Sequence, residues 1–102
     1  MDFQDLIFNR ESIRDYDPDR PVDKEILDRI LEAGRLAPSA ANRQPWKFYL
    51  VSSTENLLKI RACYDRSWFK DAPHVLVVAG KKAKAWTRQS DGYNSLETDL
   101  TI

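Results

Sequence analysis

Two short stretches carry the side chains that could do chemistry, and the first lies near the N-terminus. Arg10, Ser12 and Arg14 stand at alternate positions, so an extended segment would turn all three to the same side. The two arginines would then lie about 13 Å apart, at roughly 3.3 Å per residue. A guanidinium fork and a hydroxyl suit a phosphate, and the second cation could stabilise negative charge elsewhere on the same ligand. The alternative is a solvated charged loop, the usual place for such residues.

The second stretch lies between Pro38 and Pro45. Pro38 must end or redirect the preceding helix, because proline has no N–H and crowds the turn before it. Between the prolines stand Ser39, Asn42 and Gln44, whose neutral side chains can bind the polar edge of a flat ring without adding charge. Pro45 is expected to hold Gln44 in an extended conformation. An ordinary loop is the alternative, since Pro, Ser and Asn are common loop residues.

Hydrophobic periodicity predicts the elements that must position these stretches. A helix that begins after Asp23 and ends at Pro38 would deliver the second stretch, with Val22 and Leu27 packed against each other at its start. A strand over residues 46–51 would follow, because this segment is rich in aromatic and β-branched residues. The other predicted elements are a helix over 2–8, a turn between Pro18 and Pro21, a basic and mobile connection over 81–89, and a helix from 91 onward.

The segment after the first strand is expected to form a helix, a loop and a second strand. Ser52 and Glu55 make a capping-box pattern for a helix that runs to about residue 64. A loop over 65–73 would carry Trp68 and Phe69, which could cover a ligand ring or, as the simpler interpretation, plug the core. The strand over 74–80 is apolar without alternation, which predicts cover on both faces.

Composition narrows the function classes. The chain has 102 residues, enough for one small domain, and its 16 basic and 16 acidic residues give no global reason to expect nucleic acid or an anionic membrane. The longest apolar run is far short of a membrane span, and the N-terminus does not resemble a signal peptide. The single cysteine, Cys63, rules out an internal disulfide, fits a cytoplasmic location and is not expected to be a nucleophile. His74 is the only histidine, so we expect a hydrogen-bonded residue at a strand end and no metal site.

The two stretches together resemble a known family. The segment Ala-Pro-Ser-Ala-Ala-Asn-Arg-Gln-Pro-Trp is similar to one in the nitroreductase-like, FMN-dependent oxidoreductases, and Arg-Glu-Ser-Ile-Arg-Asp-Tyr is similar to their N-terminal Arg-x-Ser-x-Arg-x-Tyr motif. The resemblance implies an α+β fold with three α/β/α layers, of which residues 1–102 would be an N-terminal portion with about two internal strands and three to four helices. It implies that FMN is bound by Arg10, Ser12, Arg14, Pro38, Ser39, Ala40, Asn42 and Gln44.

The resemblance also implies a reaction and an assembly. A nicotinamide cofactor, NAD(P)H, would visit transiently as hydride donor, and a nitroaromatic, quinone or similar electron-poor acceptor would then take its place. This fits the absence of a Gly-x-Gly-x-x-Gly fingerprint from the sequence. No catalytic acid, base or nucleophile is expected, because the flavin carries the redox chemistry. The protein would be a homodimer with FMN at the subunit interface, the arginine motif coming from one subunit and the Pro38–Gln44 loop from the other.

Two departures from the family lead to an alternative. Glu11 stands where the family often has a second basic residue, and a carboxylate near a phosphate would weaken FMN binding. Family members are close to twice this length, so we expect residues 1–102 to form a single partial domain whose C-terminal half is absent. The alternative function is therefore a truncated, non-catalytic flavin-binding or interaction module.

Overall fold

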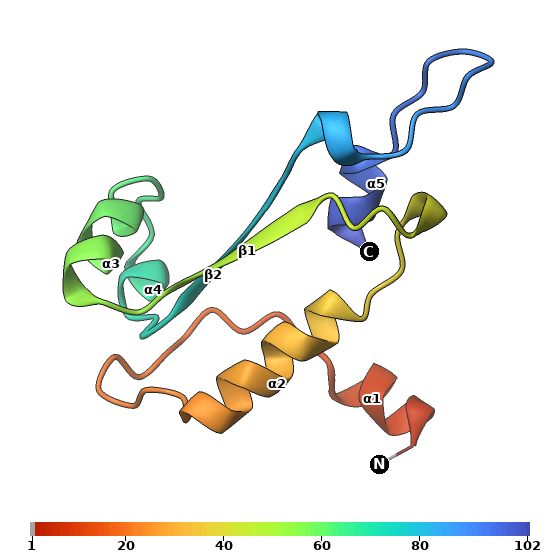
Figure 1. Ribbon diagram of the computed structural model, residues 1–102. Helices are drawn as coiled ribbons and strands as arrows, with labels where there is room; N and C mark the ends of the chain where they lie inside the picture. The colour runs from red at the N-terminus through yellow and green to blue at the C-terminus, as the bar shows by residue number, and fades with distance from the viewer. Residues whose placement is uncertain (1) are drawn as a thin grey trace.

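The computed structural model describes residues 2–102 and contains five α-helices, two 3-10 helices and two strands (Figure 1). In chain order they are α1 (Phe3–Asn9), α2 (Lys24–Arg35), η1 (Ala40–Asn42), β1 (Trp46–Val51), α3 (Thr54–Arg61), α4 (Ser67–Lys70), β2 (Val75–Gly80), η2 (Lys82–Lys84) and α5 (Leu96–Thr101). The predicted helices near the N-terminus and the two predicted strands are confirmed, whereas the number of helices is larger than the three or four expected.

Local hydrogen bonds explain where the first two helices begin and end. Asp2 caps α1, because its side chain accepts from the backbone N–H of Asp5 while the Asp5 carboxylate accepts from the N–H of Asp2. Asp23 stands at the N-cap of α2 as predicted, but its side chain makes no capping hydrogen bond. The helix ends at Arg35, before Pro38, which agrees with the expected effect of that proline.

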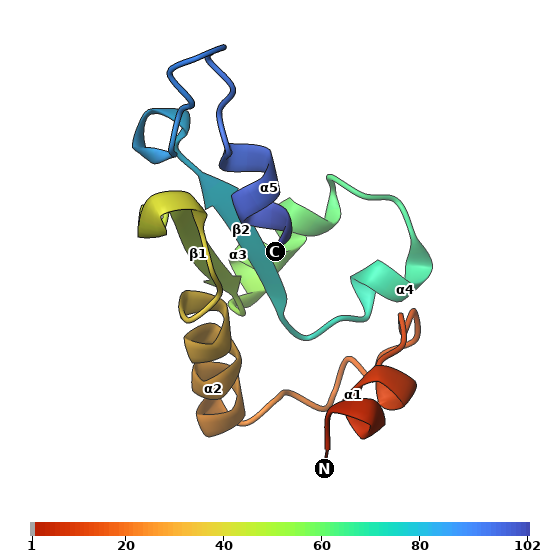
Figure 2. The same ribbon diagram turned by 90° about the vertical axis from the view of Figure 1, so that its right-hand side faces the viewer.

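The two strands form an antiparallel two-stranded sheet in which Trp46 pairs with Gly80 and Val51 with Val75. Two helices contact the same face of this sheet, because Gly34 of α2 lies against the Phe48 ring and Gly80 lies against Leu96 and Leu100 of α5. Figures 1 and 2 show both helices beside the strands. A shallow groove remains between α2, α5 and this face of the sheet.

The expectation that the second strand is covered on both faces is wrong. Burial alternates along β2, and Leu76 and Val78 remain 39% and 41% exposed. The physical reason is that β2 pairs with one antiparallel neighbour, and α5 packs mainly on its end at Gly80. A strand sequence that is apolar at every position therefore predicted more burial than β2 has within residues 2–102.

Three boundaries in the middle of the chain also differ from prediction. The N-cap of α3 is Ser53, whose hydroxyl accepts from the N–H of Asn56, and not Ser52. The helix ends at Arg61, three residues before the expected end at Tyr64. The segment predicted as a loop contains the short helix α4, which carries Trp68 and Phe69.

The aromatic residues of this region pack on one another. Trp68 and Phe69 contact each other and the Tyr64 ring, with centroids 5.5–6.0 Å apart, and Tyr16 lies 6.2 Å from Trp68. Both Trp68 and Phe69 are half-buried. The cluster therefore ties the segment after α1 to α4. Both aromatics also line the groove beside α4, so the expectation that they plug the core stays a prediction.

His74 is hydrogen-bonded at the start of the second strand, as predicted. Its Nε2 accepts from the backbone N–H of Val22 at 3.0 Å, and its Nδ1 lies 2.7 Å from the Ser52 hydroxyl. Because Nε2 accepts, the proton of the neutral ring is on Nδ1 and is donated to Ser52. His74 thus joins three segments that are distant in sequence.

The connection from β2 to α5 has regular structure that the sequence did not predict. It contains η2 and an isolated bridge between Thr87 and Asn94. The helix predicted from residue 91 begins only at Leu96, because the backbone of Tyr93 accepts from Arg88 and belongs to the turn that the bridge closes. No helix within residues 2–102 is long and apolar enough to cross a membrane.

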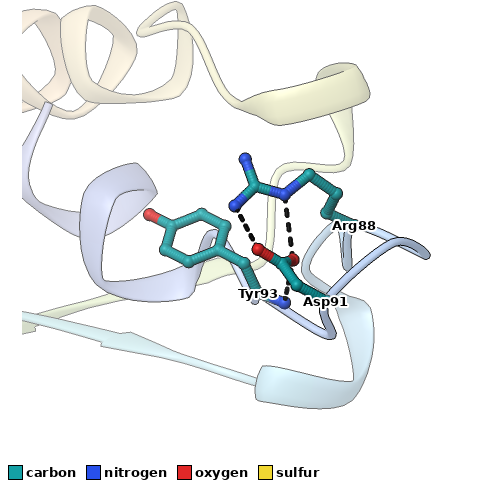
Figure 3. Close-up of polar contacts among 3 residues, drawn as sticks. All are labelled: Arg88, Asp91 and Tyr93. Atoms are coloured by element: carbon teal, nitrogen blue, oxygen red, sulfur yellow. Dashed lines mark hydrogen bonds and ion pairs between the residues drawn. The ribbon is translucent and has the colours of Figure 1, made fainter.

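Figure 3 shows how this turn is held. The Arg88 guanidinium donates two hydrogen bonds to Asp91, at 2.9 and 2.6 Å, and its plane lies over the Tyr93 ring at 5.2 Å. These hydrogen bonds lower the pKa of the Asp91 carboxyl and raise the pKa of Arg88. All three residues are about half exposed to solvent. An ion pair this exposed contributes little to stability, so the Arg88–Asp91 pair orders the turn more than it stabilises the fold.

Candidate functional site

The arginine motif lies in the irregular segment between α1 and α2. Arg10, Ser12 and Arg14 are exposed, while Ile13 and Asp15 line an apolar groove of about 600 Å³ beside α4. Tyr16 and Asp17 line the same groove and Ile13 is itself 52% exposed, so burial along this segment does not follow the strict alternation expected of an extended strand. The segment is anchored beyond the motif by Tyr16, whose ring packs on Trp68 and whose hydroxyl donates to the Ile13 carbonyl at 2.8 Å.

The motif side chains are free to bind a ligand. Within residues 2–102, neither arginine forms an ion pair, and the Ser12 hydroxyl makes no hydrogen bond. Glu11 and Asp15 are the nearest acidic residues along the chain, and both are also exposed and unpaired in this part of the structure. Two guanidinium groups without carboxylate partners are an arrangement that can bind an anion.

The loop from Pro38 to Pro45 has an unusual backbone. Ala41, Asn42 and Gln44 have φ angles of 54°, 52° and 49°, in the left-handed region that residues with a Cβ rarely adopt. The expectation that Pro45 holds Gln44 extended is therefore wrong. The Gln44 N–H donates to the Ser39 hydroxyl at 3.0 Å, and this bond across the loop overrides the local preference of a residue before proline.

Hydrogen bonds at both ends fix the loop to the rest of the chain. Pro45 is fully buried, and its carbonyl accepts from the N–H of Lys81 at 2.9 Å, which joins the loop to the end of β2. The N–H of Ala40 donates to Oδ1 of Asp99 in α5 at 3.0 Å. The side chains of Asn42 and Gln44 make no hydrogen bond within residues 2–102 and are exposed. Their side chains are therefore exposed while the backbone that carries them is fixed by hydrogen bonds, an arrangement that suits a ligand-binding loop.

Asp99 is the residue of this region that the sequence did not single out. It is 3% exposed, and its second oxygen accepts from the hydroxyl of Ser95, itself 4% exposed, at 2.7 Å. A signal was available, because Asp99 stands between Leu96 and Leu100 on the apolar stripe of its helix. A carboxylate in such a stripe is a buried polar group that must find a hydrogen-bonding partner.

The structure brings residues together within each motif but not between the motifs. Arg10, Ser12 and Arg14 share one segment, and Pro38, Ser39, Ala40, Asn42 and Gln44 share the loop around η1. In both views the loop lies apart from the segment that follows α1 (Figures 1 and 2). The intervening helix α2 has 12 residues and is about 18 Å long, enough to separate them.

Residues 7–66 match the sequence profile of the Nitroreductase family. The chain belongs to the nitroreductase family. It is 40% identical over 79 residues to a Methanothermobacter thermautotrophicus protein assigned as an NADH dehydrogenase/NAD(P)H nitroreductase, an alignment that covers 76% of this chain and 41% of that protein. The family match over residues 7–66 includes both motifs.

Solved structures show that the fold is the nitroreductase fold. A nitroreductase family protein from Clostridium difficile superposes with a TM-score of 0.87 at 35% identity and covers 99% of this chain and 56% of its own. An Exiguobacterium sibiricum protein assigned as a nitroreductase, whose crystal structure contains FMN, superposes with a TM-score of 0.70 at 32% identity, covering 82% of this chain and 41% of its own. The chain thus spans about half the length of the relatives that it matches.

Proposed function

We propose that this chain is an FMN-dependent oxidoreductase that uses NAD(P)H to reduce nitroaromatic, quinone or similar electron-poor acceptors. One observation carries the proposal. Five side chains of the two family motifs are exposed and make no hydrogen bond or ion pair within residues 2–102, namely Arg10, Ser12, Arg14, Asn42 and Gln44. The backbone of the second motif is fixed by hydrogen bonds to Asp99 and Lys81. The choice of cofactor is supported by the FMN in the crystal structure of one relative. The choice of hydride donor is supported by the name of another relative, which includes NAD(P)H nitroreductase.

The residues present suit the chemical groups of FMN. Arg10 and Ser12 would hold the phosphate, since a guanidinium and a hydroxyl supply directed donors to its oxygens. Arg14 would lie near the flavin ring and stabilise the negative charge of its reduced form. FMN, when bound, supplies the hydride chemistry, so the role of the protein is to bind and orient it and to set the charge around it.

The loop would contact the ring. Asn42 and Gln44 each offer donors and acceptors without net charge, as the polar edge of a flavin requires. Pro38, Ser39 and Ala40 form the turn that carries them, and Ser39 is already bonded to the backbone of Gln44. In this proposal no residue of the chain acts as an acid, base or nucleophile.

We also propose that the site is shared by two copies of the chain. A folded monomer of 11.9 kDa exposes about 5,900 Å², whereas this chain exposes 8371 Å². The excess of about 2,400 Å² is surface that further protein can cover, and both a second copy and the part of the domain that only the longer relatives show would supply such cover. A dimer would also let the arginine motif of one copy meet the loop of the other, which the 18 Å or so of α2 makes difficult within one chain.

Titration of the purified chain with FMN tests the function. We expect absorbance bands of bound flavin near 375 and 450 nm, which are approximate positions for protein-bound flavins, and bleaching of the longer-wavelength band when NAD(P)H is added. A chain that binds FMN but is not reduced by NAD(P)H would instead be the non-catalytic flavin-binding module. A chain that is colourless after unbound FMN has been removed would contradict the oxidoreductase and favour the interaction module.

Arg14→Ala tests the assigned ligand contact. Loss of a charge-assisted hydrogen bond is expected to weaken FMN binding by about 1.5–3 kcal/mol, or roughly 10- to 150-fold. Arg29→Ala is the matched control, because Arg29 is an exposed arginine of α2 outside both motifs and should leave the affinity unchanged. Equal affinities for Arg14→Ala and the parent would contradict the assignment.

Mixing two variants tests whether the site is shared. Arg14→Ala and Asn42→Ala would each damage a different half of the site, so each alone should bind FMN weakly. If the halves come from different copies, co-refolded heterodimers regain one intact site of two, and the bound FMN rises. Heterodimers that are confirmed by mass spectrometry and bind no more FMN would point to a site within one chain.

A further inference from the structure

The conformation of the Pro38–Pro45 loop needs an external support. Ala41, Asn42 and Gln44 are the non-glycine residues with positive φ within residues 2–102, and they stand within four consecutive positions. The left-handed region brings Cβ too close to the following carbonyl oxygen, so a free loop of this sequence would leave it. Such a backbone persists only where the surrounding structure holds it.

Asp99 supplies that support from another element. Among residues 2–102, it is the one side chain outside the loop that hydrogen-bonds to the loop, through the Ala40 N–H at the start of η1. Its other oxygen is bonded to Ser95 on its own helix, so the carboxylate cannot turn away without losing a second bond. Leu96 and Leu100 on either side pack on Gly80, which fixes the helix to the sheet.

The hydrogen bond from the Ala40 N–H to Asp99 lies at the position where the left-handed segment of the loop begins. Ala40 directly precedes Ala41 and Asn42, so fixing its amide sets where the left-handed turn begins. The Ser39–Gln44 bond then closes the turn, and the Lys81–Pro45 bond fixes its exit. Without Asp99 the loop keeps its own cross-link but loses the contact that orients it on the protein.

We propose that Asp99 is a positioning residue for the flavin-binding loop. It does not touch the ligand; it holds the Ala40 amide so that Asn42 and Gln44 face the ring. The effect on FMN rests on the function proposed above, whereas the effect on the loop can be measured without any ligand.

The test is Asp99→Asn in the full chain. Asparagine keeps the shape of the side chain but removes its charge, so a hydrogen bond from the Ala40 N–H to its oxygen is no longer charge-assisted, and the contact with Ser95 persists only if that hydroxyl turns to accept from the new amide. Glu97→Gln is the matched control, because it makes the same chemical change at an exposed position of the same helix. Hydrogen exchange and backbone NMR are measured without FMN, and FMN affinity is measured by titration.

We expect the Ala40 amide of Asp99→Asn to exchange about 10-fold or more faster than in the parent, as loss of a charge-assisted hydrogen bond implies. Chemical shifts and three-bond couplings should report loss of the positive φ angles of Ala41 and Asn42, whereas Gln44, which keeps its bond to Ser39, should retain its positive φ. FMN affinity should fall about 10-fold or more, and Glu97→Gln should match the parent in all three measurements.

Parent-like exchange at Ala40 and parent-like φ angles in Asp99→Asn would overturn the proposal. If the parent binds no FMN, the proposed function fails, and the exchange and φ measurements still decide the role of Asp99. If Asp99→Asn does not fold, Ser95→Ala is measured in its place, because it leaves the carboxylate but removes the hydroxyl that orients it. Exchange at Ala40 that is faster relative to the rest of the chain supports the role, and exchange that changes equally at all amides overturns it.

Discussion

Replacing Ala41 with glycine is expected to stabilise the protein, although glycine usually weakens ordered structure. Ala41 has φ 54° and ψ 22° and is exposed, so its methyl group adds backbone strain without packing in the core. The left-handed conformation costs a residue with a Cβ roughly 1–2 kcal/mol. Glycine costs about 0.5–1 kcal/mol through the greater freedom of the unfolded chain. The net expectation is a gain of about 0.5–1 kcal/mol.

Urea unfolding at a fixed protein concentration measures this gain. The concentration must be matched, because any association of the chain contributes to its apparent stability. The midpoint should rise while the dependence on urea stays the same, since the surface exposed on unfolding does not change. Ala33→Gly is the control, because Ala33 is an exposed residue within α2, where glycine is expected to cost about 1 kcal/mol.

The comparison of the two variants decides the result. If Ala41→Gly lowers the free energy of unfolding as much as Ala33→Gly, residue 41 is not left-handed and the reasoning about loop strain is wrong. Opposite signs would support it. The loop would then keep its shape with less strain, and FMN affinity should be unchanged or higher.

Three further outcomes are expected. Gly80→Ala should destabilise the protein by about 1–3 kcal/mol in urea unfolding, because a Cβ there would lie 2.5 Å from Leu96 and crowd α5 against β2. His74→Ala should cost about 1–3 kcal/mol, since it leaves the Val22 N–H without its partner. The pKa of Asp91 is lowered from 3.8 by its hydrogen bonds from Arg88, so the contribution of this pair to stability is present above pH 3.8 and is lost as the pH falls through the lower folded value. An NMR titration should therefore show Asp91 titrating below 3.8, and a midpoint that does not rise in Arg88→Ala would contradict this cause.

The sequence predicted the elements whose signals are local. Three such signals act within a few residues: the apolar spacing of α1, the long apolar stripe of α2 before Pro38, and the β-branched and aromatic residues of β1. The short helix α4 was missed because its four residues include two aromatics with no clear period. The start of α5 was placed too early because Tyr93 fits the helical spacing but is held in a turn by the Thr87–Asn94 bridge.

The backbone of the binding loop could not be predicted for a different reason. A proline at position 45 acts on Gln44 through local sterics and favours an extended residue. The hydrogen bond from the Gln44 N–H to the Ser39 hydroxyl spans five positions and favours a left-handed conformation of Gln44. Local rules contain the first effect and not the second, so the sequence predicted the position of the loop but not the conformation of Gln44.

The dependence of the loop on Asp99 was hidden because one partner is a backbone amide. Any residue except proline at position 40 would offer the same N–H. The sequence therefore shows no complementary side chain at position 40 that would predict a bond to a carboxylate 59 positions later. The family profile covers residues 7–66, which include both binding motifs but not this acid. A segment that contains all the proposed FMN contacts therefore lacks the group that orients half of them. It follows that substitution of Asp99 in α5, a helix that supplies none of the proposed FMN contacts, should change FMN affinity through the shape of the loop alone.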